Sequence, residues 1–468
     1  MNRPLLRWFG TVLVVAVAAG PATAQTGTFN LEKTKTVMTG LIERVIKERG
    51  VPSVSIALVR GDSIVWKAAF GYANVRTRTL ATPETIYSTG STFKSATATA
   101  LMQLQEQGKF KLDQPVNQYL GDIQVQDRLQ VEKPVTFRHM LSHWSGLTAG
   151  AVTKPLWGRE LPKPLEKMVA GLYSVRAPES KWEYNNFAYG MAGLLIEKIS
   201  GTEYEKYMLE HVLVPLGVTT AHPVYPSPEM VELMALPYTA GGKNGNPQPV
   251  AQVHFDVYPA GDIYLTAEDM ARFLAVHLNG GMFRGKRILS EASVQAMREP
   301  QFGGTYAFGL SVKQDEKGHT IISHSGGIPG QSSLMLGDVD AKVGVYFMSN
   351  SGAPAAIGEA ALKLLRGEEY TPPAEPKAIA VEPKVLDAYV GVYELNADLV
   401  FTVTRDGSKL MMRQGDAPTL VELLAKSPTT FFVGGNDATL TFVAGPSGAT
   451  EKAVLEVGGS QTNLKKRK

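Results

Sequence analysis

The chain has 468 residues, of which 44% are hydrophobic and 19% are charged, and its formal net charge is +3. This composition excludes disordered, collagen-like and coiled-coil proteins, and the balance of charge gives no reason to expect nucleic acid as a partner. Because the chain has no cysteine, it has no disulfide, no thiolate nucleophile and no cysteine-based zinc site. Its length suggests two or three domains.

Residues 1–24 have the pattern of a secretory signal peptide. Arg3 and Arg7 precede an apolar stretch, 8–19, that is too short to span a bilayer core of about 30 Å. Small residues before and at Ala24 fit a cleavage site. We therefore expect a periplasmic or secreted protein that has no stable membrane insertion after cleavage. The alternative is an uncleaved membrane anchor.

The rest of the first domain begins with strands, continues with helices and returns to strands. Apolar residues at helical spacing run over 37–46, and Gly50 ends that helix. The segments that follow are strands at 53–59 and 63–69, a helix at 91–107, a mostly helical region at 137–278, strands at 320–323, 332–336 and 343–350, and a helix at 356–365. This order predicts an α+β domain whose single sheet combines strands from both ends.

A change of composition marks a second domain. The segment 371–383 holds four prolines and little periodicity, which is typical of a linker between a first domain at 25–370 and a β-rich domain at 384–460. Short alternating segments in the second domain predict an antiparallel sheet or a small barrel. These segments are 400–404, 410–413, 431–433, 439–443 and 452–457. The basic residues in 461–468 are interpreted as a solvated tail.

The first candidates for chemistry are Ser91 and Lys94, near the start of a predicted helix. Positions i and i+3 share a helix face, so the amine can approach the hydroxyl. A serine is a poor nucleophile unless a base takes its proton, and a lysine is such a base when burial or a cation lowers its pKa. The first N–H groups of a helix can also stabilise an oxyanion. The structural alternative is a capping serine and a surface lysine.

A second pair of candidates is Tyr184 and Asn186. A tyrosine beside a lysine cation loses its proton more easily, because the cation favours the phenolate. The amide of Asn186 can donate a hydrogen bond to a substrate carbonyl. The structural alternative is a tyrosine packed at the start of a helix over 187–199.

A third group of candidates is His324, Gly326 and Gly327, at the end of an apolar strand. Glycines let a substrate backbone approach, and an exposed strand edge can pair with it. The N–H of Gly327 can join that of Ser91 in an oxyanion hole. The structural alternative for His324 is a surface or core histidine.

Taken in this order, Ser-x-x-Lys, Tyr-x-Asn and His-x-Gly resemble the motifs of the penicillin-recognising serine hydrolases. The similar branch contains class C β-lactamases, D-alanyl-D-alanine carboxypeptidases, D-aminopeptidases and related esterases. Further stretches that look like this branch are 71–73, 137–147, 259–262, 308–310 and 326–330. Over residues 30–366 the resemblance implies an α+β fold, with an antiparallel sheet flanked by helices and a helical subdomain. The part from Lys384 onward, with 389–393, looks like the lipocalin-like domain of some members.

The resemblance also implies roles for single residues. Ser91 would be the acylated nucleophile, and Lys94 and Tyr184 would carry its proton. The positions at the oxyanion and the substrate would be Asn186, His324, Gly326 and Gly327. No metal and no organic cofactor are implied, and the partners would be small-molecule esters, peptides or β-lactams.

Two features depart from the family pattern. Most β-lactamases of this type have Lys-Thr-Gly where this chain has His324, whose ordinary pKa of about 6.5 leaves it only partly charged near pH 7. This favours an esterase or a D-amino-acid peptidase, which often carry His there, over enzymes that bind a substrate carboxylate. The segment 177–180 lacks the Pro-Gly that is frequent before the tyrosine motif, so the local turn is expected to differ.

We therefore expect an exported serine hydrolase that cleaves an ester or amide bond through an acyl-enzyme on Ser91. A β-lactamase or D,D-carboxypeptidase stays open as an alternative, as does a non-catalytic sensor on the same fold. The absence of His-Glu-x-x-His, His-x-His and Gly-x-Ser-x-Gly argues against a metal hydrolase and an α/β-hydrolase. His139 and His143 are interpreted as structural residues near the wall of the active site.

Overall fold

The computed structural model of the chain describes residues 28–131, 133–148, 156–157, 160–218, 228–239, 247–371, 378–395, 400–415, 420–433, 438–457 and 460–467. The expected signal peptide, 1–24, lies outside the described residues. Among the helices within these ranges, none is both long enough and apolar enough to cross a membrane.

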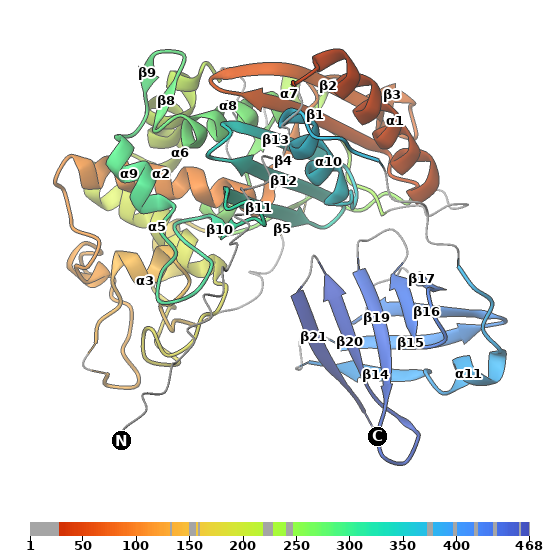
Figure 1. Cartoon of the computed structure of the whole chain (residues 1–468). Helices are drawn as coiled ribbons and strands as arrows, with labels where there is room; N and C mark the ends of the chain where they lie inside the picture. Colours follow the sequence, from red (N-terminus) through yellow and green to blue (C-terminus); the bar gives the residue numbers. More distant parts are fainter. Residues whose placement is uncertain are drawn as a thin grey trace, which may run out of the picture.

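A seven-stranded antiparallel sheet forms the centre of the first domain (Figure 1). Its strands, in spatial order, are β10 (Ser311–Gln314), β11 (Thr320–Ile328), β12 (Gln331–Asp338), β13 (Val343–Ser349), β1 (Ser53–Arg60), β2 (Ser63–Asn74) and β3 (Thr79–Leu80). The pairing of β1 with β13 joins strands from the two ends of the domain. The prediction of one sheet built from both ends is therefore confirmed.

Helices cover both faces of this sheet. α1 (Leu31–Arg49) and α10 (Ala356–Leu365) lie on one face, and α8 (Ala267–Leu278) packs on the other (Figure 1). Successive residues of β1 enter the two cores in turn, with Ile56 on the side of α1 and Ala57 on the side of α8. Because side chains alternate along a strand, a strand between two helical layers is buried on both faces, as β1 is from Ser53 to Val59.

The first helix begins and ends at residues that carry capping signals. The Asn30 side chain accepts a hydrogen bond from the Lys33 amide at 2.9 Å, which satisfies one of the free N–H groups at the start of α1. Gly50 follows the helix in the left-handed conformation, with φ of +62°. The sequence prediction that Gly50 ends this helix is confirmed.

The helical region that follows β3 positions the site. The predicted helix 91–107 is a 3-10 turn, η1 (Gly90–Phe93), followed by α2 (Lys94–Glu106), and α2 packs against α5 (Asn186–Ser200). Other short helices are α3 (Phe137–Leu141), α4 (Leu165–Val169), α6 (Tyr204–Tyr207), α7 (Pro228–Val231) and α9 (Glu291–Met297). Short 3-10 or π segments are η2 (Val116–Gln118), η3 (Met208–Leu213), η4 (Val214–Leu216) and η5 (Tyr258–Ala260). Two-stranded pairs are β4 (Tyr87–Ser88) with β7 (Tyr264–Leu265), β5 (Leu156–Trp157) with β6 (Val253–His254), and β8 (Met282–Phe283) with β9 (Lys286–Arg287).

The C-terminal part is a closed antiparallel β-barrel of eight strands, preceded by α11 (Pro383–Asp387) (Figure 1). The strands are β14 (Gly391–Glu394), β15 (Val400–Asp406), β16 (Lys409–Gln414), β17 (Val421–Ala425), β18 (Thr430–Val433), β19 (Ala438–Ala444), β20 (Thr450–Val457) and β21 (Ser460–Lys466). Buried aromatic side chains contribute to the apolar cluster of this domain, among them Tyr393, Phe431 and Phe442. The sequence left open a sheet or a barrel, and the structure shows the barrel.

The ends of this barrel correct one sequence interpretation. The basic residues read as a tail at 461–468 belong to β21 as far as Lys466, and Tyr393 of β14 pairs with Lys466 to close the barrel. These residues form a strand although their side chains are basic. The backbone pairs with two neighbouring strands, and the long basic side chains still reach water. At the other end, Ile379 donates to the Ala425 carbonyl, so part of the predicted linker 371–383 is attached to the barrel.

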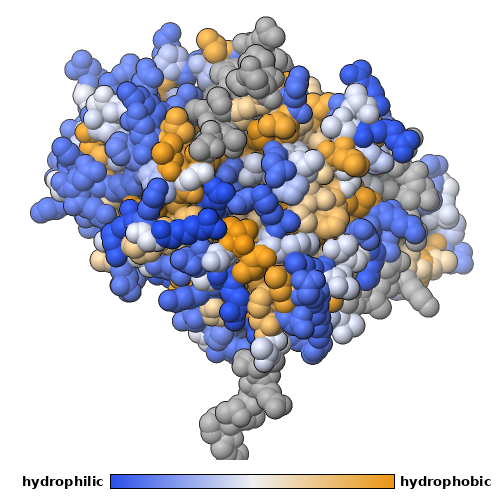
Figure 2. Space-filling model, turned by 90° about the horizontal axis from the view of Figure 1, so that it is seen from above, coloured by the Kyte–Doolittle hydropathy of each residue, from blue (hydrophilic) through white to orange (hydrophobic). Residues whose placement is uncertain are grey.

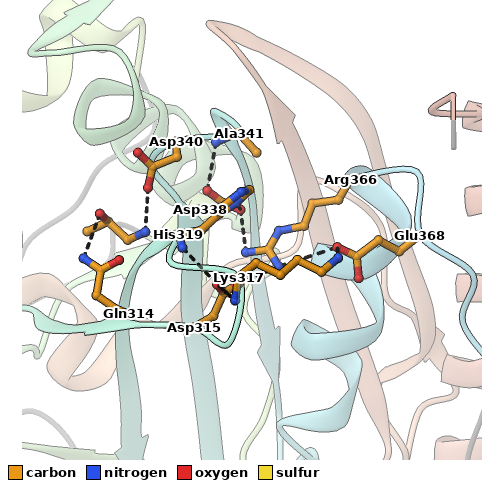
Figure 3. A network of polar contacts seen from close by, with 10 residues as sticks. Gln314, Asp315, Lys317, His319, Asp338, Asp340, Ala341, Arg366 and Glu368 are labelled. Atoms are coloured by element: carbon orange, nitrogen blue, oxygen red, sulfur yellow. Dashed lines mark hydrogen bonds and ion pairs between the residues drawn. The ribbon is translucent and has the colours of Figure 1, made fainter. Parts of the chain in front are cut away.

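A network of ion pairs holds the start of β11 (Figure 3). Asp338, which is fully buried at the end of β12, accepts a hydrogen bond from His319 at 2.7 Å and pairs with Arg366. Arg366 also contacts Asp315 at 2.8 Å, and the network extends through Glu368 to a lysine. It ties the β10–β11 hairpin to the end of α10.

The surface of the molecule is largely hydrophilic on the face that Figure 2 shows, where hydrophilic side chains surround smaller groups of hydrophobic ones.

Candidate active site

The η1 turn brings Ser91 and Lys94 together. Three residues complete one turn of a 3-10 helix, so side chains at i and i+3 lie directly above one another. The Lys94 Nζ atom is 2.9 Å from the Ser91 Oγ atom and donates a hydrogen bond to the Ala260 carbonyl at 2.7 Å. Lys94 is fully buried, whereas Ser91 is half-exposed. The hydroxyl can therefore meet a substrate while the amine stays away from water.

Glycines allow the backbone to pack closely around this turn. Gly90 has φ of +55°, and a Cβ atom there would lie 2.7 Å from the Gly327 nitrogen. A Cβ atom on Gly261 would lie 2.1 Å from the Gly90 oxygen. Real Cβ atoms do not come so close, so both positions require glycine. The family-like stretches 259–262 and 326–330 are thus the packing partners of the turn that carries Ser91.

The second half of β11 lies beside this turn. β10 pairs with β11 only as far as Ser323, and beyond this point Gly326 lies against Thr89 and Ser91. A Cβ atom on Gly326 would lie 2.4 Å from the Thr89 oxygen and 3.2 Å from the Ser91 nitrogen. Gly327, the next residue, is exposed and has open space in front of it. The structure therefore brings Ser91, Gly326 and Gly327 together, as the sequence predicts.

Tyr184 approaches the same point from the segment before α5. Its ring centroid is 4.9 Å from the Lys94 Nζ atom, and within the described part of the chain its buried hydroxyl has no hydrogen-bond partner other than the nearby Ser91 hydroxyl. Burial raises the pKa of Tyr184 above its ordinary value, and the nearby Ser91 hydroxyl opposes this rise. The expectation that a lysine cation lowers this pKa is therefore corrected, because desolvation dominates.

Two asparagines, Asn185 and Asn186, lie at the start of α5. Asn185 caps the helix, since its side chain accepts from the Ala188 amide at 3.1 Å and donates to the Thr148 carbonyl at 3.1 Å. Asn186 is the first residue of α5 and is half-buried, two residues after Tyr184. Its backbone position is thus fixed by the cap that precedes it.

The side chain of His324 is held in one tautomer. Its Nδ1 atom lies 2.7 Å from the Ser325 carbonyl, which can only accept, so Nδ1 carries the proton. The Nε2 atom then accepts from the Tyr306 hydroxyl at 2.8 Å. Burial, followed by the nearby Lys94, lowers the pKa of His324 to about 3. At pH 7 the third motif is neutral, and more completely so than the ordinary histidine pKa implies.

Lys94 is a buried amine without an acidic partner. Desolvation holds the pKa of Lys94 well below its ordinary value of 10.5. None of the ion pairs found among the described residues includes Lys94. Its neighbours are instead a hydroxyl, a carbonyl and the rings of Tyr184 and Tyr189. A neutral amine next to a serine hydroxyl has the lone pair that a base needs.

Aromatic rings surround these groups, and among them the sequence analysis named only His143, as a structural residue near the wall of the active site. Tyr306 bonds His324, and the ring of His143 lies 4.4 Å from that of Tyr184 and 4.6 Å from that of Tyr306. Trp182 is 40% exposed at the edge of the cluster. Tyr306 follows no motif of its own, but it lies just before the family-like stretch 308–310, which is the one signal that points to it.

The turn before Tyr184 keeps its shape without glycine. Glu179 adopts φ of +65°, in the left-handed region that normally favours glycine. Its carboxylate contacts the His139 Nε2 atom at 2.7 Å and the Lys133 Nζ atom at 2.6 Å. These contacts offset the backbone strain. The segment 177–180 therefore holds a left-handed residue without glycine. Whether this turn differs from that of other family members stays a prediction.

Two models of known protein families match this chain. The family model described as Beta-lactamase matches residues 38–368. This chain belongs to the β-lactamase family. A second model, described as a domain of unknown function (DUF3471), matches residues 375–466 and so includes all eight strands of the barrel. This β-lactamase-family protein is thus a serine hydrolase with a C-terminal β-barrel domain.

Relatives of this β-lactamase-family chain have several activities. Penicillin-binding protein 4* of Bacillus subtilis is 25% identical over 441 residues, which cover 86% of this chain and 94% of that protein. The octameric penicillin-binding protein homologue from Pyrococcus abyssi has a TM-score of 0.62 at 25% identity and covers 92% of this chain and 100% of its own. The D-amino acid amidase from Ochrobactrum anthropi SV3 (TM-score 0.57, 23% identity, 72% of this chain and 95% of its own) shares the fold.

Proposed function

We propose that this serine hydrolase cleaves esters or amides that carry no carboxylate, including those of D-amino acids, through an acyl-enzyme on Ser91. The observation that carries the proposal is the fully buried Lys94 amine, 2.9 Å from the Ser91 hydroxyl, which forms no ion pair with a carboxylate of the described residues. A lysine becomes a base when its ammonium form is disfavoured, and burial does this here.

In the proposed acylation step, the Ser91 proton passes to the Lys94 nitrogen as the Ser91 oxygen attacks the substrate carbonyl. The Ala260 carbonyl orients the amine by accepting one of its N–H groups. The backbone N–H groups of Ser91 and Gly327 would receive the oxyanion. The Tyr184 hydroxyl would pass the proton from Lys94 to the leaving group. Water then attacks the acyl group along the same proton path and frees Ser91.

The charge state of the site supports substrates without a carboxylate. His324 stands where the resemblance to class C β-lactamases implies a lysine, and its pKa of about 3 leaves it uncharged at neutral pH. Burial also disfavours the ammonium form of Lys94, so the site attracts a carboxylate less strongly than a site with a permanent cation would. The D-amino acid amidase and EstCE1, described as a hydrolase with promiscuous acyltransferase activity, share this fold at 23% and 19% identity, and this is consistent with ester or amide substrates.

The test is a substrate panel on the wild type and on the Ser91→Ala variant. We expect hydrolysis of p-nitrophenyl butyrate or D-alanine p-nitroanilide to exceed that of nitrocefin, and a fluorophosphonate probe to label the wild type but not Ser91→Ala. Higher kcat/KM for nitrocefin than for both other substrates would instead support a β-lactamase or D,D-carboxypeptidase. A wild type that neither turns over substrate nor takes the label would support a sensor.

We also propose that the protein is exported, on the basis of the pattern in residues 1–24. Expression in a Gram-negative host with periplasmic extraction tests this. We expect the N-terminus of the extracted protein to be Gln25. A full-length chain in the membrane fraction would favour the uncleaved anchor.

A further inference from the structure

One residue, His143, holds the backbone on both sides of Tyr184. The carbonyl of His143 accepts a hydrogen bond from the Glu183 amide at 2.9 Å. Its Nδ1 atom accepts a second from the Asn185 amide at 3.1 Å. The imidazole ring itself lies 4.4 Å from the Tyr184 ring. The two amides that flank Tyr184 are thus fixed by the main chain and the side chain of the same residue.

Tyr184 needs such support because its own hydroxyl does not anchor it. Within the described part of the chain, only Ser91, itself the proposed nucleophile, lies close enough to hydrogen-bond that buried hydroxyl. The position of the phenol oxygen near Ser91 and Lys94 is therefore set by the backbone and by ring packing. Reacting groups must be held in place by the residues around them, and a misplacement of about 1 Å can lower a rate by about 100-fold.

His143 is itself held in an unusual conformation. Its φ is +66°, in the left-handed region that costs a histidine backbone strain, and its side chain is buried between aromatic rings. This conformation lets the carbonyl and the Nδ1 atom of one residue serve two amides that are two residues apart. Strained backbone that persists in a packed site is a reason to look for a role.

The hydrogen bonds also explain why this residue is an imidazole rather than a phenyl ring. Because Nδ1 accepts from Asn185, the proton of the neutral ring lies on Nε2. That Nε2 atom is buried and has no partner among the described residues. A phenyl ring would pack against the same aromatic neighbours without leaving an N–H unpaired. The distinct contribution of His143 is therefore its Nδ1 acceptor.

We propose that His143 is a positioning residue that fixes the Tyr184 hydroxyl beside Ser91 and Lys94 by accepting hydrogen bonds from the amides on both sides of Tyr184. Its effect on turnover rests on the proposed function of Ser91. Its effect on the backbone does not, so the two parts can be measured separately.

The experiment compares His143→Asn with His143→Gly. Both residues adopt positive φ readily, and both lack the imidazole ring, but only asparagine has an oxygen that can replace Nδ1 as the acceptor. The first measurement is kcat and KM for p-nitrophenyl butyrate, per site labelled by the fluorophosphonate. The second is amide hydrogen exchange resolved at Asn185, with the Glu183 amide, which the main chain holds, as the internal control.

We expect His143→Gly to lower kcat at least tenfold with a KM change below threefold, and to speed exchange at Asn185 at least tenfold. We expect His143→Asn to stay within about threefold of the wild type in both measurements. If amide exchange at Asn185 becomes as fast in His143→Asn as in His143→Gly, the acceptor does not hold the backbone and the inference is overturned.

The exchange measurement also separates this inference from the proposed function. A wild type without turnover would count against Ser91 catalysis, yet exchange at Asn185 in the two variants would still decide whether His143 holds the backbone. If exchange follows the expected pattern while kcat per labelled site is the same in both variants, His143 has a structural role only, and the positioning inference is wrong.

Discussion

The two ends of β11 use opposite electrostatic arrangements. At the start of the strand, buried Asp338 is matched by Arg366 and by His319 in a network of ion pairs (Figure 3). At the end of the strand, buried Lys94 and His324 have no ionic partner among the described residues, and their neighbours are hydroxyls, carbonyls and aromatic rings. One strand of nine residues connects the two regions.

The difference shows how burial produces either stability or reactivity. A buried charge that has a partner keeps its charge and holds neighbouring segments together. A buried basic group without an acidic partner loses its proton instead, as the lowered pKa values of Lys94 and His324 indicate. The first arrangement fixes the β10–β11 hairpin, and we propose that the second supplies the base for Ser91. Removing residues at each end should therefore have opposite consequences.

The largest expected effect is that of Lys94→Met on activity. We expect kcat for p-nitrophenyl butyrate to fall by about 10²–10⁴-fold, because the base is lost. The free energy of unfolding should stay within about 1 kcal/mol of the wild type, since the loss of two hydrogen bonds is offset by the removal of a buried polar amine. Urea unfolding measures this. A loss of more than about 3 kcal/mol would show that Lys94 is a stabilising residue, and it would contradict the proposed difference between the two ends of β11.

At the other end of β11, Arg366→Met should lower stability and spare turnover. It leaves the fully buried Asp338 without its cation, and we expect the free energy of unfolding to fall by about 3–5 kcal/mol. The matched control is Lys33→Met, which removes the exposed pair with Glu369 and should cost at most about 1 kcal/mol. Equal losses in the two variants would mean that the network contributes no more than a surface pair.

A charge introduced at the active-site end should change substrate preference. In His324→Lys, a cation near the substrate would attract a carboxylate, and a hydrogen bond to a charged group contributes about 1.5–3 kcal/mol. We expect the ratio of kcat/KM for nitrocefin to that for p-nitrophenyl butyrate to rise about tenfold. His324→Gln, which stays neutral, is the control. An unchanged ratio in His324→Lys would show that the charge at this position does not select substrates.

The smallest expected effect concerns pH. The neutral Lys94 amine is the active form, so kcat/KM for a neutral ester should fall as pH drops through the lowered pKa of Lys94 and persist as pH rises. His324, with a pKa of about 3, stays neutral between pH 5 and 8 and should add no step there. The profile of His324→Gln should therefore match the wild type. A step near pH 6.5 that disappears in this variant would show that the imidazole titrates.

Much of the fold could be predicted because local patterns carry it. The helix that ends at Gly50 lies where spacing and caps place it, the helix 356–365 lies where its pattern places it, and strands with apolar runs marked both ends of the sheet. β10 was missed because its four residues, Ser311–Gln314, show two polar side chains at the end and gain their structure by pairing with β11. β21 was missed for a similar reason, since its lysines mask a strand that closure of the barrel requires.

The sequence by itself determined the residue types of the site and their order along the chain. The spacing of Ser91 and Lys94 is local, and a single turn satisfies it. The tertiary structure decided the protonation of these groups and the identity of their supports. Tyr306 and His143 come from segments far from Tyr184 and Lys94, and the low polarity that they help create exists only after folding. A pKa depends on what surrounds a group in space, and the chain order does not contain that information.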